Sequence, residues 1–266
     1  MTEPVTPSEG WGVLHLFFHL RRDLLADPPA AAKDFVARVE AFDAREDQQA
    51  LAFSVLGQKA DLGLMLLGPD LAALDAFGAE LSASPLGAGL LPAASYVSLT
   101  ELSEYTATAD DESRRLVEEE GLAEGSAEHA EAVRAFTERM VTYARHRLYP
   151  RLPRRAVLSF YPMSKRRDPG ANWYALAFEE RKGLMAGHAR VGRRYRGRVL
   201  QLVTGSVGLD DWEWGITLLA EDPKAIRDIV YDMRFDEVSA RYGEFGPFVT
   251  GLVLEPAQLM GRLRLL

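Results

Sequence analysis

The chain of 266 residues contains no cysteine. Without cysteine there are no disulfides, thiolate nucleophiles, iron–sulfur clusters or cysteine-held zinc sites, and a cytoplasmic location is the expected one. Apolar runs are short, and none approaches the roughly 20 residues of a membrane-spanning helix, so we expect no membrane partner. The G-x-S-x-G and H-E-x-x-H motifs of serine hydrolases and zincins do not occur. Any metal must be held by histidine, carboxylate, tyrosine or a cofactor.

Acidic residues are scarce in one long segment. Residues 145–198 carry 15 Lys or Arg and only three Asp or Glu, a local net charge of +12, although the whole chain has a net charge of −8. Like charges this close repel one another unless solvent or a bound anion compensates them. An anionic ligand is therefore the first hypothesis, and a solvated basic face is the alternative. A nucleic acid is a third possibility, but RNA-recognition modules carry an RNP1-like aromatic motif that this sequence lacks. We expect no nucleic-acid partner.

The hydrophobic pattern repeats once along the chain. The first half predicts the order β-α-β-β-α-β at residues 11–20, 30–45, 51–56, 63–67, 70–81 and 95–102, and the second half predicts it again at 156–161, 178–195, 199–204, 213–219, 222–242 and 248–254. Residues 63–67 (GLMLL) match residues 215–219 (GITLL), and the same offset places residues 96–97 on 248–249. We therefore predict an α+β fold in which two fused ferredoxin-like units form a dimeric α+β barrel.

The repeat predicts three parts: an N-terminal ferredoxin-like unit at residues 1–109, a connector at 110–146 and a C-terminal ferredoxin-like unit at 147–266. Within the connector, residues 110–131 contain nine acids and only two bases. This composition is typical of a mobile, solvated surface segment. Residues 130–145 then show helical apolar spacing, which predicts a helix leading into the second unit.

Two of the five histidines, His15 and His19, are four residues apart on a predicted strand. Their spacing there is about 13 Å, which argues against a shared metal and favours a core or rim position. His188 lies in the apolar stripe of the predicted helix 178–195. Such a histidine is usually buried and hydrogen-bonded, and the alternative is a ligand role. One imidazole is too little for a zinc site but is enough for a haem iron, because the porphyrin supplies four donors.

Tyr161 and Lys165 end the first predicted strand of the second unit, 27 residues before His188. A tyrosine at a strand end usually packs, and the basic residues after it are usually exposed. The alternative is that a phenol and an ammonium group act together in a site.

The C-terminal half resembles the chlorite dismutase-like haem proteins, and within that family the coproheme decarboxylases. The resemblance rests on residues 161–167 (YPMSKRR), 172–188 (NWYALAFEERKGLMAGH), 192–199 (GRRYRGRV), 201–215 (QLVTGSVGLDDWEWG) and 231–243 (YDMRFDEVSARYG). It is dense from residue 147 to the C-terminus and sparse before it, although residues 101–105 (ELSEY) also fit.

The resemblance implies that the C-terminal unit binds iron-coproporphyrin III with His188 as the iron ligand. Hydrogen peroxide would oxidise the iron, and Tyr161 would become a phenoxyl radical that takes a hydrogen atom from a propionate. Loss of CO2 would leave a vinyl group, and two rounds would give haem b. Lys165 would hold the second reactive propionate. Further substrate contacts would come from Arg147, Met163, Arg193, Gln201, Ser239 and Tyr105.

The resemblance also implies a homopentamer and a coproporphyrin ferrochelatase as a partner. Chlorite dismutases carry an arginine where this chain has Gln201, which argues against chlorite as the substrate. Ala144 stands where some decarboxylases have a distal histidine, so the proton acceptor is left open. The alternative function is a haem peroxidase or another chlorite dismutase-like enzyme.

Overall fold

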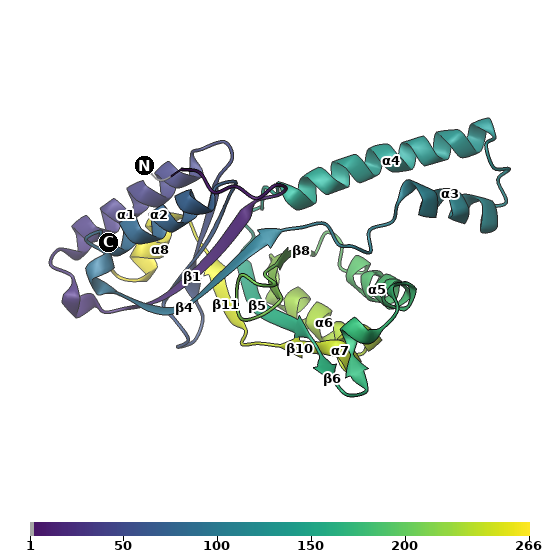
Figure 1. Cartoon of the computed structure of the whole chain (residues 1–266). Helices are drawn as coiled ribbons and strands as arrows, with labels where there is room; N and C mark the ends of the chain where they lie inside the picture. Colours follow the sequence, from purple (N-terminus) through teal and green to yellow (C-terminus); the bar gives the residue numbers. More distant parts are fainter. Residues whose placement is uncertain (1–2) are drawn as a thin grey trace.

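A large antiparallel sheet dominates the computed structural model, which describes residues 3–266 (Figure 1). Its strands follow the order β10-β5-β11-β2-β3-β1-β4-β8-β9, and β5 pairs with β9 as well, which closes the sheet into a ring. The strands are β1 (Gly12–Leu20), β2 (Gln49–Val55), β3 (Leu62–Gly68), β4 (Leu90–Thr100), β5 (Val157–Lys165), β8 (Val199–Gly205), β9 (Trp214–Ala220), β10 (Gly243–Phe245) and β11 (Val249–Val253).

The order of the strands confirms the predicted α+β fold and its repeat. In the first unit the order is β2-β3-β1-β4, and in the second it is β8-β9-β5-β11, so corresponding strands occupy corresponding places. The fourth strand of each unit pairs with the second strand of the other, as β4 with β8 and β11 with β2. The two halves of one chain therefore build one closed barrel.

Helices cover the outside of the barrel on two sides. Figure 1 shows α1, α2 and α8 over the first unit and α5, α6 and α7 beside the second. Strands β2 and β3 are buried along their whole length because one face meets these helices and the other faces the barrel interior. The helices are α1 (Pro28–Asp43), α2 (Leu71–Ser82), α3 (Ala109–Glu118), α4 (Ala127–Leu148), α5 (Phe178–Arg193), α6 (Pro223–Met233), α7 (Glu237–Tyr242) and α8 (Pro256–Arg262).

Side-chain caps set the ends of several helices. Asp70 and Asp222 cap α2 and α6 with their side chains. The single helix predicted at 222–242 is wrong, because α6 ends at Met233 and α7 begins at Glu237. The carboxylate of Asp236 accepts from the backbone N–H of Ser239 and starts the second helix.

The acidic connector contains a helix that its charge run did not predict. Helix α3 begins with a capping box between Thr108 and Asp111, and its acidic first turn suits the positive end of the helix dipole. Arg115 pairs with Glu112 one turn before it. Helix α4 is longer than predicted and packs against α3, and Figure 1 shows the two extending from the barrel as a hairpin.

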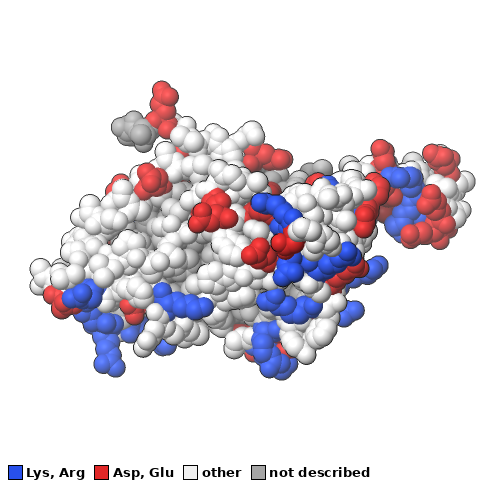
Figure 2. Space-filling view, turned by 60° about the horizontal axis from the view of Figure 1, so that its bottom comes forward, with Lys and Arg blue, Asp and Glu red and all other residues white. Residues whose placement is uncertain are grey.

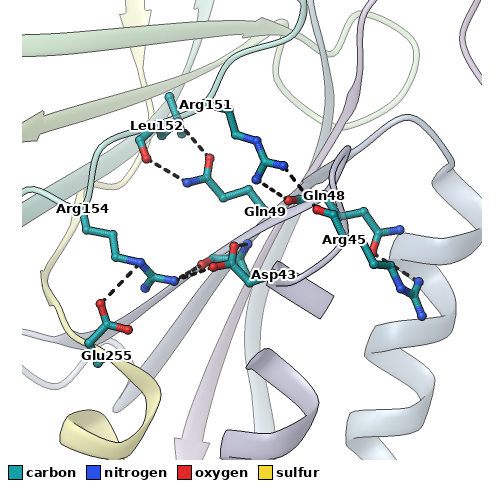
Figure 3. A network of polar contacts seen from close by, with 9 residues as sticks. Asp43, Arg45, Gln48, Gln49, Arg151, Leu152, Arg154 and Glu255 are labelled. Carbon is teal, nitrogen blue, oxygen red and sulfur yellow. Dashed lines mark hydrogen bonds and ion pairs between the residues drawn. The ribbon is translucent and has the colours of Figure 1, made fainter. Parts of the chain in front are cut away.

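The segment after α4 is fastened to the first unit by a polar network (Figure 3). The side chain of Gln49 makes two bonds to the backbone of Leu152, both 2.8 Å. Arg151 donates to the carbonyl of Gln48 at 2.7 Å, and Arg154 lies 2.9 Å from an Asp43 carboxylate oxygen. These bonds satisfy backbone groups of a segment that has no strand partner of its own.

We expect Gln49→Leu to destabilise the protein by about 2–4 kcal/mol, because it leaves the buried N–H and C=O of Leu152 unpaired. The matched control is Gln58→Leu in an exposed turn, which should change stability by less than about 0.5 kcal/mol. Urea unfolding of both variants measures the difference. Equal stabilities would show that the Gln49 network contributes nothing.

Candidate functional site

Three of the predicted site residues share one face of β5. Side chains alternate along a strand, so Tyr161, Met163 and Lys165 point the same way. Tyr161 pairs with Ile216 of β9 and packs in the cluster formed with α6 and with Tyr195, which follows α5. The face that carries the phenol is therefore the one covered by the helices of the second unit.

Tyr161 is a buried, neutral phenol. Its ring stacks on Phe248 with centroids 4.2 Å apart, and 7% of the residue is exposed. Burial raises the pKa of its hydroxyl to about 12, against a smaller lowering by Arg234. Among residues 3–266 this hydroxyl has no hydrogen-bond partner. The group stays protonated at neutral pH and is not tied to a neighbouring acceptor.

Lys165 is an amine buried among aromatic rings and carboxylates. Its Nζ lies 4.5 Å from the ring centroid of Trp173. Burial lowers the pKa of the amine to about 8, while Asp236 and Glu213 act in the opposite direction. Lys165 lines an open cavity of about 380 Å³ together with Ser164, Arg167, Asp168, Asp211, Trp212 and Glu244.

His188 is held by a carboxylate from another helix. It lies on α5, and its Nδ1 is 2.7 Å from Oδ2 of Asp236. The same oxygen accepts the N–H of Ser239 at 3.3 Å, so one carboxylate caps α7 and orients the imidazole. Because Nδ1 faces the carboxylate, Nε2 is the nitrogen available as a ligand. No residue of α5 is fully buried, and His188 is half-buried.

Arg147 comes to this region from the last turn of α4. Its Nη1 donates to the backbone carbonyl of Gln201 at 3.2 Å, and its Nε is buried without a partner among residues 3–266. The hydroxyl of Thr100 donates to the carbonyl of Leu148 at 2.7 Å and fixes the end of α4 beside β4. A guanidinium with an unpaired buried N–H is suited to receive a carboxylate.

The remaining predicted contacts lie at the border of this region. Tyr105 accepts from Nε of Arg181 at 3.0 Å and stacks on Phe178 at the start of α5. Ser239 is buried in α7 next to Asp236. Arg193 is exposed at the end of α5, and the structure gives it no contact with the other predicted residues.

The histidines of the barrel and the connector have structural environments. His15 is buried in the barrel, where it bonds Thr217 at 3.1 Å and stacks on Phe160, and burial lowers its pKa to about 3. His19 is largely exposed, so the two share no metal. His129 bonds Ser113 and joins α3 to α4. Within residues 3–266 no group of three or more His, Asp or Glu has an arrangement that could hold a metal ion.

Some cations of the basic segment lie beside acidic side chains of the chain. Figure 2 shows Lys and Arg side chains interspersed with acidic ones on the face turned to the viewer. Arg167 pairs with Glu213, and Lys182 pairs with Asp111 of α3 at 2.7 Å. The Lys182 amine holds the pKa of the Asp111 carboxyl well below its usual range, with help from the Thr108 cap. Within residues 3–266, four of the 15 basic residues of this segment, Arg154, Arg167, Arg181 and Lys182, pair with a carboxylate, so only part of the positive charge is compensated by ion pairs.

Two residues of this region carry roles that the sequence did not reveal. Asp236 and Glu101 stand out in the sequence only as members of longer motifs. Each acts on a residue far along the chain, His188 for the first and Trp214 for the second. The partners are 48 and 113 residues apart in the sequence, so no local pattern predicts these contacts.

The chain belongs to the chlorite dismutase family, whose family model matches residues 29–254. A protein of Natronomonas pharaonis named "Putative heme-binding protein" is 38% identical over 266 residues, which cover 97% of this chain. The chain spans only 41% of the length of that relative.

Solved structures share the fold. A heme-binding protein from Thermus thermophilus has a TM-score of 0.77 and 36% identity, and the match covers 100% of this chain and 99% of that one. Chlorite dismutase from Candidatus Nitrospira defluvii in complex with imidazole has a TM-score of 0.70 and 18% identity, with 96% of each chain covered. At 18% identity, the match to the chlorite dismutase structure shows only that the two chains share a fold. None of the helices in residues 3–266 has the length and apolar character needed to cross a membrane.

We expect Asp236→Ala to cost more stability than Asp222→Ala. Both changes remove a helix N-cap, worth about 1 kcal/mol, but only Asp236 also pairs with a histidine. Loss of that contact should add about 1 kcal/mol. Urea unfolding of the two variants gives the comparison. Equal losses would mean that the contact with His188 contributes nothing to stability.

Proposed function

We propose that this chain binds iron-coproporphyrin III and, with hydrogen peroxide, converts two of its propionates to vinyl groups, giving haem b. The proposal rests on Tyr161, a neutral phenol on the face of the sheet that the helices of the second unit cover. One of these helices, α5, carries His188, whose imidazole is held by the carboxylate of Asp236. Membership of the chlorite dismutase family and the heme-binding names of two relatives support a porphyrin ligand.

The residues present fit an iron porphyrin. A histidine that ligates a metal usually gives its other ring nitrogen to a carboxylate or carbonyl, which fixes the ring and raises its basicity. Asp236 does this for His188 and leaves Nε2 for the iron. The absence of a cluster of ligands among residues 3–266 is no obstacle, since the porphyrin supplies four donors itself.

Buried cations suit the carboxylates of the substrate. Arg147 has an unpaired buried N–H, and Lys165 has its amine over an aromatic ring rather than on a carboxylate. Charge-assisted bonds from such groups to carboxylates are stronger than neutral ones. We assign Lys165 to the second reactive propionate and Arg147 to another. Met163, Gln201, Ser239, Tyr105 and Arg193 are proposed as further contacts.

Each round removes one CO2 and two hydrogen atoms from a propionate and reduces one hydrogen peroxide to two waters. The iron, when bound, would pass to peroxide both the electron given up by Tyr161 and the second electron that the propionate loses with CO2. Tyr161 gives up an electron and a proton together and returns to the phenol by taking a hydrogen atom from the propionate β-carbon. A pKa of about 12 favours this coupled loss, because the ionised form is scarce at neutral pH. The aromatic contact with Phe248 keeps water from the ring.

The direct test is mass spectrometry of porphyrin after addition of peroxide to the protein with iron-coproporphyrin III. We expect loss of two CO2 and four hydrogen atoms. Tyr161→Phe should bind porphyrin normally and lower turnover by about 100-fold or more, equivalent to ~2.7 kcal/mol of barrier. Tyr195→Phe is the matched control, because Tyr195 is buried in the same cluster but bonds Asp232. Intact porphyrin in the wild type would refute the function and favour a peroxidase.

The rate of the second decarboxylation should fall as pH rises through about 8, because Lys165 is cationic below its pKa and loses its charge above it. At alkaline pH we expect the three-propionate intermediate to accumulate several-fold relative to neutral pH. Lys165→Arg should keep its charge and remove this dependence, and Lys165→Met should accumulate the intermediate at both pH values. Chromatography of the products measures the ratio. A wild-type ratio that does not change with pH would contradict the assignment of Lys165.

A further inference from the structure

A buried carboxylate lies where strands β5 and β9 stop pairing. The last pair of these strands joins Met163 to Trp214, and Glu213, which is buried, comes directly before β9. Its Oε2 accepts the backbone N–H of Lys165 at 2.7 Å, two residues beyond the last pair. The carboxylate of Glu213 therefore supplies the acceptor that the backbone of β9 no longer provides at the end of β5.

The second oxygen of the same carboxylate holds the hairpin that follows β5. Oε1 of Glu213 pairs with the guanidinium of Arg167, which lies in the short strand β6 (Arg167–Asp168). Strand β6 pairs with β7 (Ala171–Asn172), and Trp173 comes directly after β7. One carboxylate thus holds the end of β5 with one oxygen and the start of the hairpin that leads to Trp173 with the other.

Lys165 and Trp173 meet between these two anchors. The Nζ of Lys165 lies 4.5 Å from the centroid of the indole ring, and the backbone N–H of Trp173 donates to the carbonyl of Arg166 at 3.0 Å. The indole is buried and packs on Tyr242 with ring centroids 5.3 Å apart, so its own place is fixed. The long, flexible side chain of a lysine keeps a defined position only when its backbone and the surface that it contacts are both held.

The ion pair with Arg167 also leaves the amine of Lys165 without an anionic partner. Each oxygen of Glu213 already accepts a bond, one from a backbone N–H and the other from the guanidinium. Within residues 3–266, Lys165 makes no ion pair with a carboxylate, and its amine contacts the indole ring instead. A carboxylate that arrives with a ligand therefore meets a cation that is held in place and unpaired.

We propose that Glu213 is a positioning residue of the candidate site, whose two oxygens hold Lys165 and the hairpin before Trp173 so that the amine lies over the indole and stays unpaired. Glu213 acts through Lys165 and does not touch the ligand. That the ligand group at this amine is the second reactive propionate rests on the proposed function.

The test without ligand is NMR of protein in which the five lysines carry ¹³C. The Cε–Hε signal of Lys165, assigned through Lys165→Arg, should be shifted upfield from the other four by the ring current of Trp173. Glu213→Ala should lose most of this shift, and Glu213→Gln, which keeps one acceptor oxygen, should lose less. Arg167→Ala, a change at an exposed residue, removes only the second anchor and should lose part of the shift.

The matched control is Glu221→Ala. Glu221 directly follows β9, and its Oε2 accepts the backbone N–H of Ala156 at 3.2 Å. This bond is of the same kind but lies at the opposite end of the β5–β9 pair, so the variant should keep the wild-type signal of Lys165. A loss equal to that in Glu213→Ala would overturn the inference, since it would show a general loosening of the strands.

A Lys165 signal that is unchanged in Glu213→Ala and Arg167→Ala would also overturn the inference. If Glu213→Ala does not fold, Glu213→Gln and Arg167→Ala decide the question by the same criterion.

The test with ligand measures the products formed from iron-coproporphyrin III and hydrogen peroxide. Glu213→Ala should accumulate the three-propionate intermediate several-fold over wild type with the first decarboxylation unchanged, because only the second is assigned to Lys165. Glu221→Ala should give the wild-type ratio. A wild-type ratio in Glu213→Ala, where Lys165→Met accumulates the intermediate, would overturn the inference and leave the proposed function standing. Failure of the wild type to release CO2 would overturn the proposed function, and the lysine signal would still decide whether Glu213 positions the amine.

Discussion

Strand β5 has a neighbour along both edges, and the rest of the molecule depends on this double pairing. One edge pairs with β11 and the other with β9, which turns an open sheet into a closed ring. Closure removes exposed sheet edges and fixes the register, because a slip of one residue would send every β5 side chain to the opposite face. The register that closes the barrel is thus also what directs Tyr161 and Lys165 to the helix-covered side.

Helix α5 of the second unit packs less deeply than helix α1 of the first. Helix α1 buries five residues against its sheet, whereas α5 buries none completely. Helix α5 is held by polar contacts at both ends, with Arg181 on Tyr105 near its start and His188 on Asp236 further along. Leu184 and Met185 add apolar contacts with the cluster around Trp173, but they are only partly buried, so the helix can keep an imidazole partly open to a ligand.

Hydrophobic periodicity was enough to predict the repeat and the order of its strands and helices along the chain, because these depend on residues close together in the chain. The same reasoning failed at Asp236. Residues 222–242 have a continuous helical pattern, and the interruption depends on a carboxylate whose second partner, His188, is 48 residues away. Glu101 was missed for the same reason, since Trp214 lies 113 residues further on. Local sequence could single out Tyr161 and Lys165 as site residues, but it could not show that they share a face of β5 or which distant residues contact them.

The excess of basic residues in the segment 145–198 has two separate physical causes. Exposed members such as Arg167 and Lys182 pair with carboxylates of the chain, and Arg151 and Arg154 satisfy the backbone and side chains around the segment after α4. Each ion pair at the surface contributes little to the stability of the fold. Arg147 and Lys165 differ because each has a buried nitrogen and neither makes an ion pair within residues 3–266. A buried charge is costly unless it is paired. In a basic segment, the buried cations are therefore the ones that indicate a ligand, and of these Lys165 lies on the face of β5 that carries the phenol.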